Sequence, residues 1–188
     1  MKSVSETAAY YSALLAEYGP TYRAGDHGSA DSREARWDVL AAVLADPYAS
    51  VLDVGCGTGD WTGWRILNGE GWDVSEALIA VARDRHPKYR YHVRDLYAST
   101  EVEAYDYVVA SGLFQFASST QMDRGIARMF ALCRKAVAFN FLTRTDGTPG
   151  EQATDPALVY HRCRMLTDRI VVRIDYLPND ATMYLYRP

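Results

Sequence analysis

Residues 51–59, with the sequence VLDVGCGTG, place a short apolar run directly before three glycines that alternate with small side chains. Apolar and β-branched residues around an acid favour a buried strand, and a glycine at every second position lets the backbone bend sharply and approach a ligand. A helix that begins near Thr58 would direct its free N–H groups and its dipole at an anionic group. This stretch therefore predicts a strand, a ligand-binding turn and a helix, in that order.

Segments typical of strands alternate with segments typical of helices along the middle of the chain. The predicted strands that follow the glycine turn cover 70–74, 89–94, 105–111 and 136–142, and the predicted helices cover 60–67, 75–86 and 120–133. This alternation predicts right-handed crossovers and a parallel, doubly wound sheet. Outside this run we expect helices over 5–18, 32–44 and 156–165, and an antiparallel hairpin made of 169–176 and 181–186.

Length and composition restrict the classes of protein that fit. A chain of 188 residues with 48% hydrophobic residues suits one folded domain. Its formal charge of -4 and its lack of a basic run argue against nucleic acid as a partner. Its three widely spaced cysteines form no CxxC pair, and no apolar stretch is long enough to cross a bilayer. We therefore expect a cytoplasmic protein with no metal site and no membrane partner.

Polar groups follow three further strands of the predicted sheet, at the edge where an open parallel sheet binds its ligands. Asp73 ends the second strand, where a carboxylate can accept hydrogen bonds from both hydroxyls of a ribose. Asp95 and Leu96 follow the third strand, and residues 111–114 follow the fourth. Each group alone also fits a turn or a cap, but unrelated caps have no reason to recur at successive strand ends.

With these groups in place, the chain resembles the class I (Rossmann-like) S-adenosylmethionine-dependent methyltransferases. Residues 51–59 resemble the family's motif I, and 111–114 resemble its motif IV. The resemblance implies the strand order 3-2-1-4-5-7-6 with an antiparallel strand 7. It further implies a single domain over 1–188, with an N-terminal helical cap over 1–46 and a cofactor-binding core over 47–188.

The resemblance also implies S-adenosyl-L-methionine as the cofactor and a set of residues that would contact it. This set contains Arg36, Asp53, Gly55, Cys56, Gly57, Asp73, Val74, Asp95, Leu96, Ser111, Gly112 and Phe114. Within it, we expect the glycine turn to face the amino-acid end of the cofactor, Asp73 its ribose and Asp95 its adenine. Arg36 is a candidate partner for the cofactor carboxylate, because a guanidinium offers that group a two-pronged match.

Two other functions use the same kind of sheet. A nicotinamide-dependent oxidoreductase is less consistent with the sequence, because the glycine spacing is G-x-G-x-G and no Tyr-x-x-x-Lys occurs. A non-catalytic cofactor-binding or regulatory module stays an alternative. One departure from the family is the short link between Gly59 and Asp73, which predicts an abbreviated crossover and makes Glu70 an alternative acid for the ribose.

Methyl transfer from a sulfonium needs a nucleophile held close and aligned, and only some acceptors need a base. His27 and His161 are the candidates for such a base, since both belong to segments that could face an acceptor. The absence of an Asn-Pro-Pro-Tyr tetrapeptide after the fourth strand argues against methylation of nucleic acid bases. We expect transfer to an O or N nucleophile of a small molecule, such as a natural product. The acceptor and the oligomeric state stay open.

Overall fold

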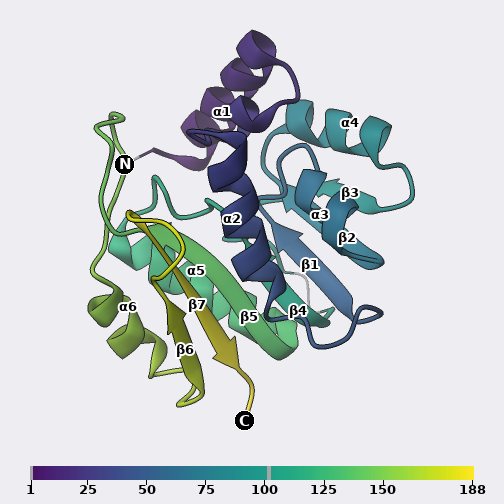
Figure 1. The fold of residues 1–188 in the computed structure, drawn as a ribbon. Helices are drawn as coiled ribbons and strands as arrows, with labels where there is room; N and C mark the ends of the chain where they lie inside the picture. Colours follow the sequence, from purple (N-terminus) through teal and green to yellow (C-terminus); the bar gives the residue numbers. More distant parts are fainter. Residues whose placement is uncertain (1, 101–102) are drawn as a thin grey trace.

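The computed structural model describes residues 2–100 and 103–188 and consists of one seven-stranded sheet with helices on both faces (Figure 1). The helical elements are α1 (Val4–Tyr18), η1 (Tyr22–Gly25), α2 (Ala30–Ala41), α3 (Asp60–Arg65), α4 (Glu76–Arg85), α5 (Ser119–Leu132) and α6 (Pro156–Cys163). The strands are β1 (Ser50–Val54), β2 (Asn68–Asp73), β3 (Arg90–Val93), β4 (Tyr105–Ala110), β5 (Cys133–Leu142), β6 (Ile170–Arg173) and β7 (Asp180–Tyr186).

The strand order is β3-β2-β1-β4-β5-β7-β6, which confirms the order implied by the family resemblance. β1 pairs in parallel with β2 on one side and with β4 on the other, whereas β7 runs antiparallel to β5 and β6. The winding of the sheet reverses between β1 and β4. In open α/β sheets the groove outside the carboxyl ends of the strands at such a point is the usual ligand site.

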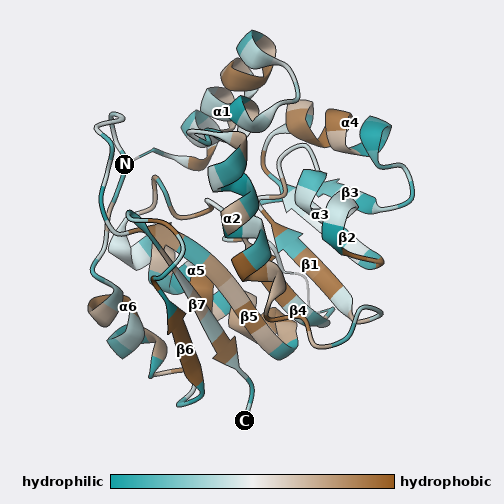
Figure 2. Cartoon of the chain, in the orientation of Figure 1, coloured by the Kyte–Doolittle hydropathy of each residue, from teal (hydrophilic) through white to brown (hydrophobic). Residues whose placement is uncertain are grey.

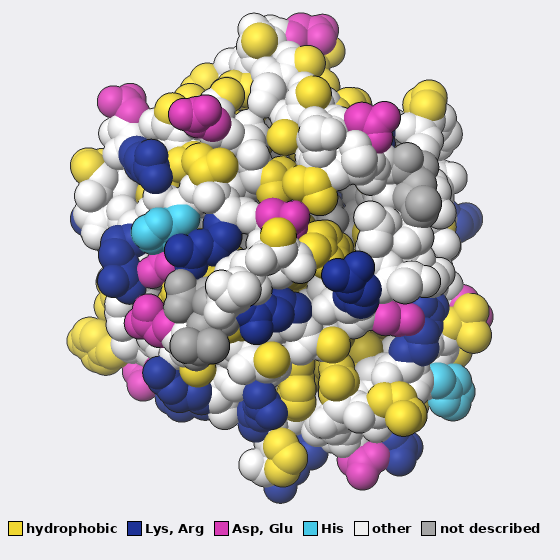
Figure 3. Space-filling view, turned by 180° about the vertical axis from the view of Figure 1, so that it is seen from behind, with side chains coloured by type: hydrophobic (Ala, Val, Ile, Leu, Met, Phe, Trp, Pro, Cys, Tyr) yellow, Lys and Arg dark blue, Asp and Glu magenta, His cyan; other side chains and the backbone are white. Residues whose placement is uncertain are grey.

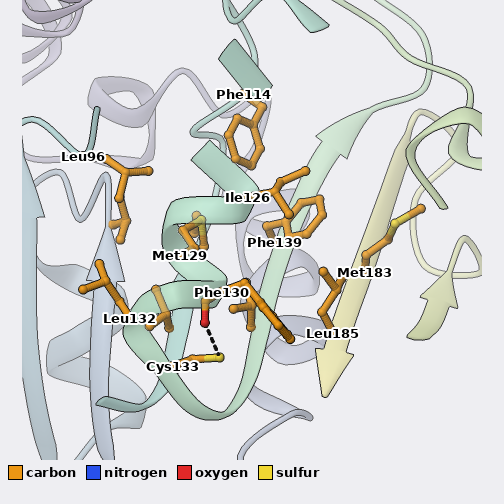
Figure 4. Packing of buried hydrophobic residues seen from close by; sticks show 14 of the residues in the cluster. Leu96, Phe114, Ile126, Met129, Phe130, Leu132, Cys133, Phe139, Met183 and Leu185 are labelled. Carbon is orange, nitrogen blue, oxygen red and sulfur yellow. Dashed lines mark hydrogen bonds between the residues drawn. The ribbon is translucent and has the colours of Figure 1, made fainter. Parts of the chain in front are cut away.

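Two large hydrophobic clusters hold α5, α2 and α3 on the sheet. α5 packs Met122, Ile126, Met129 and Phe130 against the face that also carries Phe139 of β5, and Figure 4 shows this cluster. The opposite face is covered by α2 and α3, whose Trp37, Leu40 and Trp61 contact β1, β4 and β5. The central strands appear brown in Figure 2, as expected for parallel strands covered on both sides.

The crossover after β1 is short, as the sequence predicts. α3 has six residues, and β2 starts only two residues after its end. Gly71 in β2 has no room for a side chain, since a Cβ there would lie 2.6 Å from the Tyr91 ring and 2.7 Å from Cys56 Sγ. Gly71, which weakens the strand pattern of β2, is therefore needed for close packing against β3 and the glycine turn.

Several boundaries differ from the expected ones by two or three residues. α2 begins at Ala30 instead of Ser32, because Ser29 is the N-cap and exchanges hydrogen bonds with Ser32 in a capping box. β5 begins at Cys133 instead of 136, because the chain passes directly from α5 into the strand. The two N-terminal helices, α6 and the terminal antiparallel pair lie where the sequence predicts them.

Within the predicted cap region 1–46, α1 and η1 lie beyond the carboxyl ends of the central strands (Figure 1), and we call these two elements the N-terminal cap, whereas α2 packs against the sheet. Ser12 of α1 is hydrogen-bonded to Ser75, the N-cap of α4, at 2.9 Å. Within the described residues, no helix combines the length and the apolarity that a membrane span requires. On the face seen in Figure 3, basic and acidic side chains are interspersed, without a continuous basic stripe of the kind that binds a phosphate backbone.

Candidate functional site

A cavity of about 170 Å³ lies between the N-terminal cap and the carboxyl ends of β1, β2, β3 and β4. It collects all four groups that the sequence places at successive strand ends. The predicted residues that line it are Asp53, Gly55, Cys56, Gly57, Asp73, Val74, Asp95, Leu96, Ser111 and Gly112. We call it the first cavity.

The glycine turn after β1 forms one wall of the first cavity. Gly55, Gly57 and Gly59 have φ values of +75°, +54° and +74°, in the left-handed region that favours glycine. The N–H groups of Gly55 and Cys56 donate to the carbonyl of Trp72 at 2.7 and 3.0 Å, which ties the turn to β2. A Cβ on Gly57 would meet no atom within 4 Å, so this glycine leaves room beside the turn.

Asp73 connects the turn to the next strand end. Its Oδ2 accepts a hydrogen bond from Gly57 N at 3.0 Å, and its Oδ1 accepts one from Ser75 N at 2.8 Å. Burial raises the pKa of this carboxyl, although these backbone donors act in the opposite direction. Each oxygen has a further lone pair for a ligand in the cavity.

Asp53 lies deeper, beneath the turn, and is 3% exposed. Its Oδ2 accepts a hydrogen bond from Thr62 Oγ1 of α3 at 2.9 Å. Burial raises the pKa of Asp53 to about 7, and the nearby Asp73 carboxylate acts in the same direction. Asp53 therefore joins β1 to the short α3 in addition to lining the cavity.

The third and fourth strand ends complete the wall. Asp95 is the first residue of a turn in which its Oδ1 accepts a hydrogen bond from Tyr97 N at 2.8 Å, and Leu96 is buried beside it. Gly112 has a φ of +72° and donates its N–H to Asn140 Oδ1 of β5 at 2.8 Å. Asn140 is 2% exposed, so it fixes the position of the loop after β4 from inside the sheet.

The N-terminal cap closes the first cavity with Lys2, Val4, Thr7 and Tyr11, together with residues of η1. A polar network holds this cap to the body of the protein. Asp26 Oδ2 accepts from Tyr10 Oη and from Gln115 Nε2, each at 2.8 Å, and the same Gln115 Nε2 donates to Glu151 Oε1 at 2.8 Å. The loops after β4 and β5 are thereby connected to the segment before α2.

Arg33 of α2 lines the first cavity beside Thr58 and Asp60, and the sequence analysis did not identify it. Its Nε is buried and, within the described residues, has no hydrogen-bond partner. The guanidinium lies 4.4 Å from the Trp37 ring, and its nearest carboxylate oxygens, on Glu34 and Asp60, are 4.0 Å away. Arg33 is therefore a cation without a close anion, facing the glycine turn.

Arg36 lies one helical turn further along α2, outside the first cavity. Its Nε and Nη2 donate to Asp180 Oδ2 at 2.8 and 2.5 Å, and it lines a second cavity of about 280 Å³. His27, by contrast, borders both cavities. Arg33 and Arg36 thus lie on the same face of α2 but line different cavities.

Three other candidate residues lie away from the first cavity. Phe114 is 3% exposed and packs edge-on against Phe139 in the core, as Figure 4 shows. His161 is exposed on α6, beside Tyr160, and lines neither cavity. Glu70, three residues before Asp73 in β2, accepts hydrogen bonds from Trp72 Nε1 and Tyr105 Oη and pairs with Arg90.

The chain is similar to known methyltransferases in part of its sequence and in its fold. Residues 51–136 match the family model described as methyltransferase domain. Magnesium protoporphyrin IX methyltransferase from Synechocystis PCC 6803, solved with bound S-adenosylmethionine, superposes with a TM-score of 0.75 at 15% identity over 100% of this chain and 98% of that one. The N-methyltransferase NodS from Bradyrhizobium japonicum WM9, in complex with S-adenosylhomocysteine, gives 0.75 at 19% identity over 97% and 98%.

The [4+2]-cyclase SpnF is also similar, with a TM-score of 0.76 at 14% identity over 99% of this chain and 96% of that one. At identities this low the structural likeness shows the fold alone. The matched range extends from the second residue of β1 to the fourth residue of β5, and so contains the four strand ends that line the first cavity.

Proposed function

We propose that this chain is a class I S-adenosylmethionine-dependent methyltransferase, in agreement with the methyltransferase-domain match over residues 51–136, and that it transfers a methyl group to an oxygen or nitrogen nucleophile of a small molecule. The observation that carries this proposal is the convergence of Asp73, Asp95, Ser111 and the glycine turn on one capped cavity. Unrelated strand-end caps would not need to face a common space.

The residues of the first cavity fit S-adenosylmethionine. The open space at Gly57 would be filled by a Cβ, the buried Arg33 Nε has no hydrogen-bond partner in the described part of the chain, and Asp73 presents a carboxylate at the end of β2. We assign the glycine turn and Arg33 to the amino-acid end, Asp73 to the ribose hydroxyls, and Asp95 with Leu96 to the adenine. Arg33 takes the place of Arg36 in this assignment, because Asp180 already neutralises Arg36.

S-adenosylmethionine supplies a methyl group on a positively charged sulfur, which a lone pair of the acceptor displaces in line. The contribution of the chain is to align the reactants and to exclude water. Ser111 and Gly112 lie between the glycine turn and the second cavity, and Asn140 fixes them. Tyr11 and the rest of the cap cover the site from the N-terminal side, and Phe116 of the loop after β4 lines the same cavity.

The cap and the size of the second cavity support the proposal that the methyl acceptor is a small molecule. The network of Asp26, Gln115 and Glu151 holds the cap against two loops, and the first cavity adjoins a second one of about 280 Å³. The two methyltransferases compared above are named for a porphyrin and for N-methylation. These names support small-molecule methylation here without identifying the acceptor.

Thermal unfolding with and without ligand tests the proposal. Stabilisation by RT ln(1 + [L]/Kd) predicts about 2.7 kcal/mol at a hundredfold excess of S-adenosylhomocysteine over its Kd. NADH at the same concentration is the control and should give no shift. The absence of a shift with S-adenosylmethionine and with its demethylated product would contradict the proposal, and a shift with NADH alone would favour an oxidoreductase. Binding without methylation of any small molecule in a broad panel would favour the non-catalytic module.

A further inference from the structure

The second cavity adjoins the first and shares Gly25, His27 and Gly112 with it. Its other walls come from the start of α2, the end of β5, the loop after β5 and the turn before β7. The shared residues lie where the loop after β4 meets the segment before α2. A molecule in the second cavity would therefore reach the first cavity at His27.

The orientation of His27 is fixed by a chain of two contacts. Asp180, with a side chain that is 2% exposed, accepts from Arg36 Nε and Nη2, and Arg36 Nη1 lies 3.3 Å from His27 Nδ1. A guanidinium has donors only, so the contact with Nδ1 requires a lone pair on that nitrogen. In a neutral imidazole the proton then belongs to Nε2.

No hydrogen bond within the described residues involves His27 Nε2, and this atom lies on the side of the ring next to Gly25. A Cβ on Gly25 would approach Nε2 to 3.1 Å, so the glycine leaves the N–H accessible at the junction of the two cavities. We propose that Asp180 and Arg36 hold His27 as a neutral Nε2–H donor, which positions a methyl acceptor in the second cavity through a hydrogen bond to an acceptor oxygen. This inference rests on the proposed methyltransferase function.

The same arrangement argues against His27 as a general base. Burial lowers the pKa of His27 to about 3, and the Arg36 and Arg33 guanidiniums act in the same direction. The lone pair at Nδ1 faces Arg36, and Nε2 already carries the proton. His27 therefore has no free lone pair with which to take a proton from an acceptor, and its role is positioning.

The charged groups around the second cavity limit the chemical class of the acceptor. Besides Arg36, the second cavity is lined by four carboxyl groups. Asp26 belongs to the loop of His27, Asp146 and Glu151 to the loop after β5, and Asp180 to the start of β7. A neutral His27 leaves these groups in excess over cationic ones. We therefore expect an uncharged or cationic acceptor that bears an oxygen, and we expect anionic acceptors to be repelled.

The tautomer is tested by nuclear magnetic resonance of protein with ¹⁵N-labelled histidine, saturated with S-adenosylhomocysteine. The chain has four histidines, and the variant His27→Gln identifies the signals of His27 by their loss. We expect the pattern of an Nε2–H imidazole that does not titrate between pH 5 and 8. An Nδ1–H pattern, or titration with a midpoint near the ordinary histidine value of about 6.5, would overturn the proposal.

A paired substitution tests the role of the Asp180–Arg36 pair. Removing both charges together, as Arg36→Met with Asp180→Asn, avoids an unpaired buried ion. Without the Arg36 donor, the lone pair on His27 Nδ1 loses its partner, so the Nδ1–H tautomer should become populated in the same experiment. An unchanged tautomer in this folded variant would show that the pair does not hold His27.

The occupant of the second cavity is tested with small probes. At saturating S-adenosylhomocysteine, 10 mM catechol or tyramine should shift the His27 signals, and benzoate should shift them less. Preference for benzoate, or no shift with any of the three, would overturn the assigned acceptor class.

The variant His27→Ala should leave the Kd of S-adenosylhomocysteine within about twofold of the original. A tenfold loss would show that Nε2–H serves the cofactor carboxylate instead of an acceptor. Failure of the proposed function is distinguishable, because the unmodified protein would then not bind S-adenosylhomocysteine.

Discussion

Asp73→Asn should weaken the binding of S-adenosylhomocysteine strongly. In the proposed complex the carboxylate accepts hydrogen bonds from ribose hydroxyls while it also holds Gly57 N and Ser75 N at 3.0 and 2.8 Å. Hydrogen bonds to a charged group contribute about 1.5–3 kcal/mol each, and the amide keeps one acceptor oxygen. The loss of one such bond to the ribose corresponds to a Kd about 10- to 150-fold higher, measured by isothermal titration calorimetry.

Glu70→Gln is the matched control, because it replaces a buried acid of the same strand by its amide. Glu70 contacts Trp72, Tyr105 and Arg90 and does not line the first cavity. This variant should lose stability in urea unfolding, whereas its affinity for S-adenosylhomocysteine should change less than twofold. A normal Kd in the Asp73 variant, with a raised Kd in the Glu70 variant, would refute the assignment of the ribose to Asp73.

Four further variants test the turn, the buried acid and the cation of the first cavity. Gly59→Ala should cost about 2–4 kcal/mol in urea unfolding, because its φ is +74° and its Cβ would lie 2.6 Å from Tyr91 Oη. Gly57 also has a positive φ but has open space around it, so Gly57→Ala should lower the free energy of unfolding less than Gly59→Ala does. It should weaken cofactor binding more, because the added methyl group would occupy that space. The pKa of Asp53 is about 7 in the folded state, whereas in the unfolded state it is near 4. Between these two pH values the folded state binds the extra proton, so the free energy of unfolding should fall as the pH rises from about 4 to about 7. Asp53→Asn should flatten this decline in thermal unfolding at pH 4–8, and an unchanged slope would contradict the shift. Arg33→Met should raise the Kd of S-adenosylhomocysteine about 10- to 150-fold but spare 5′-methylthioadenosine, which lacks the carboxylate; equal losses for both ligands would remove Arg33 from this role.

Much of the sheet and of the first cavity could be predicted from the sequence, because both depend on local signals. Gly55 and Gly57 mark the turn, and Asp73, Asp95 and Ser111 lie at strand ends that the apolar pattern locates. The strand order came from the family resemblance and not from periodicity. Helix and strand ends were less exact where a cap such as Ser29, or a direct helix-to-strand passage, sets the boundary.

Contacts between residues distant in the sequence could not be predicted. The partner of Arg36 is Asp180, 144 residues away, and no local pattern indicates that pair. Phe114 belongs to a motif that suggests the cavity, but its side chain fills the core next to Phe139. His161 has the residue type of a base, whereas its helix presents it to solvent. The sequence gives the chemical type of each side chain, whereas tertiary packing decides whether that side chain points into the cavity, into the core or into solvent.

The different surroundings of the two arginines of α2 explain how one helix can serve two cavities. Arg36 is bound to a buried carboxylate at 2.5 Å, so a second anion beside it would meet little net positive charge. Arg33 is 4.0 Å from its nearest carboxylate oxygens, and Asp60, one of those partners, already pairs with Arg85 at 2.6 Å. The Arg33 guanidinium can therefore accept a new anion without breaking a short contact. It follows that an anionic ligand group is stabilised at the glycine turn, whereas Arg36 acts on the second cavity through His27.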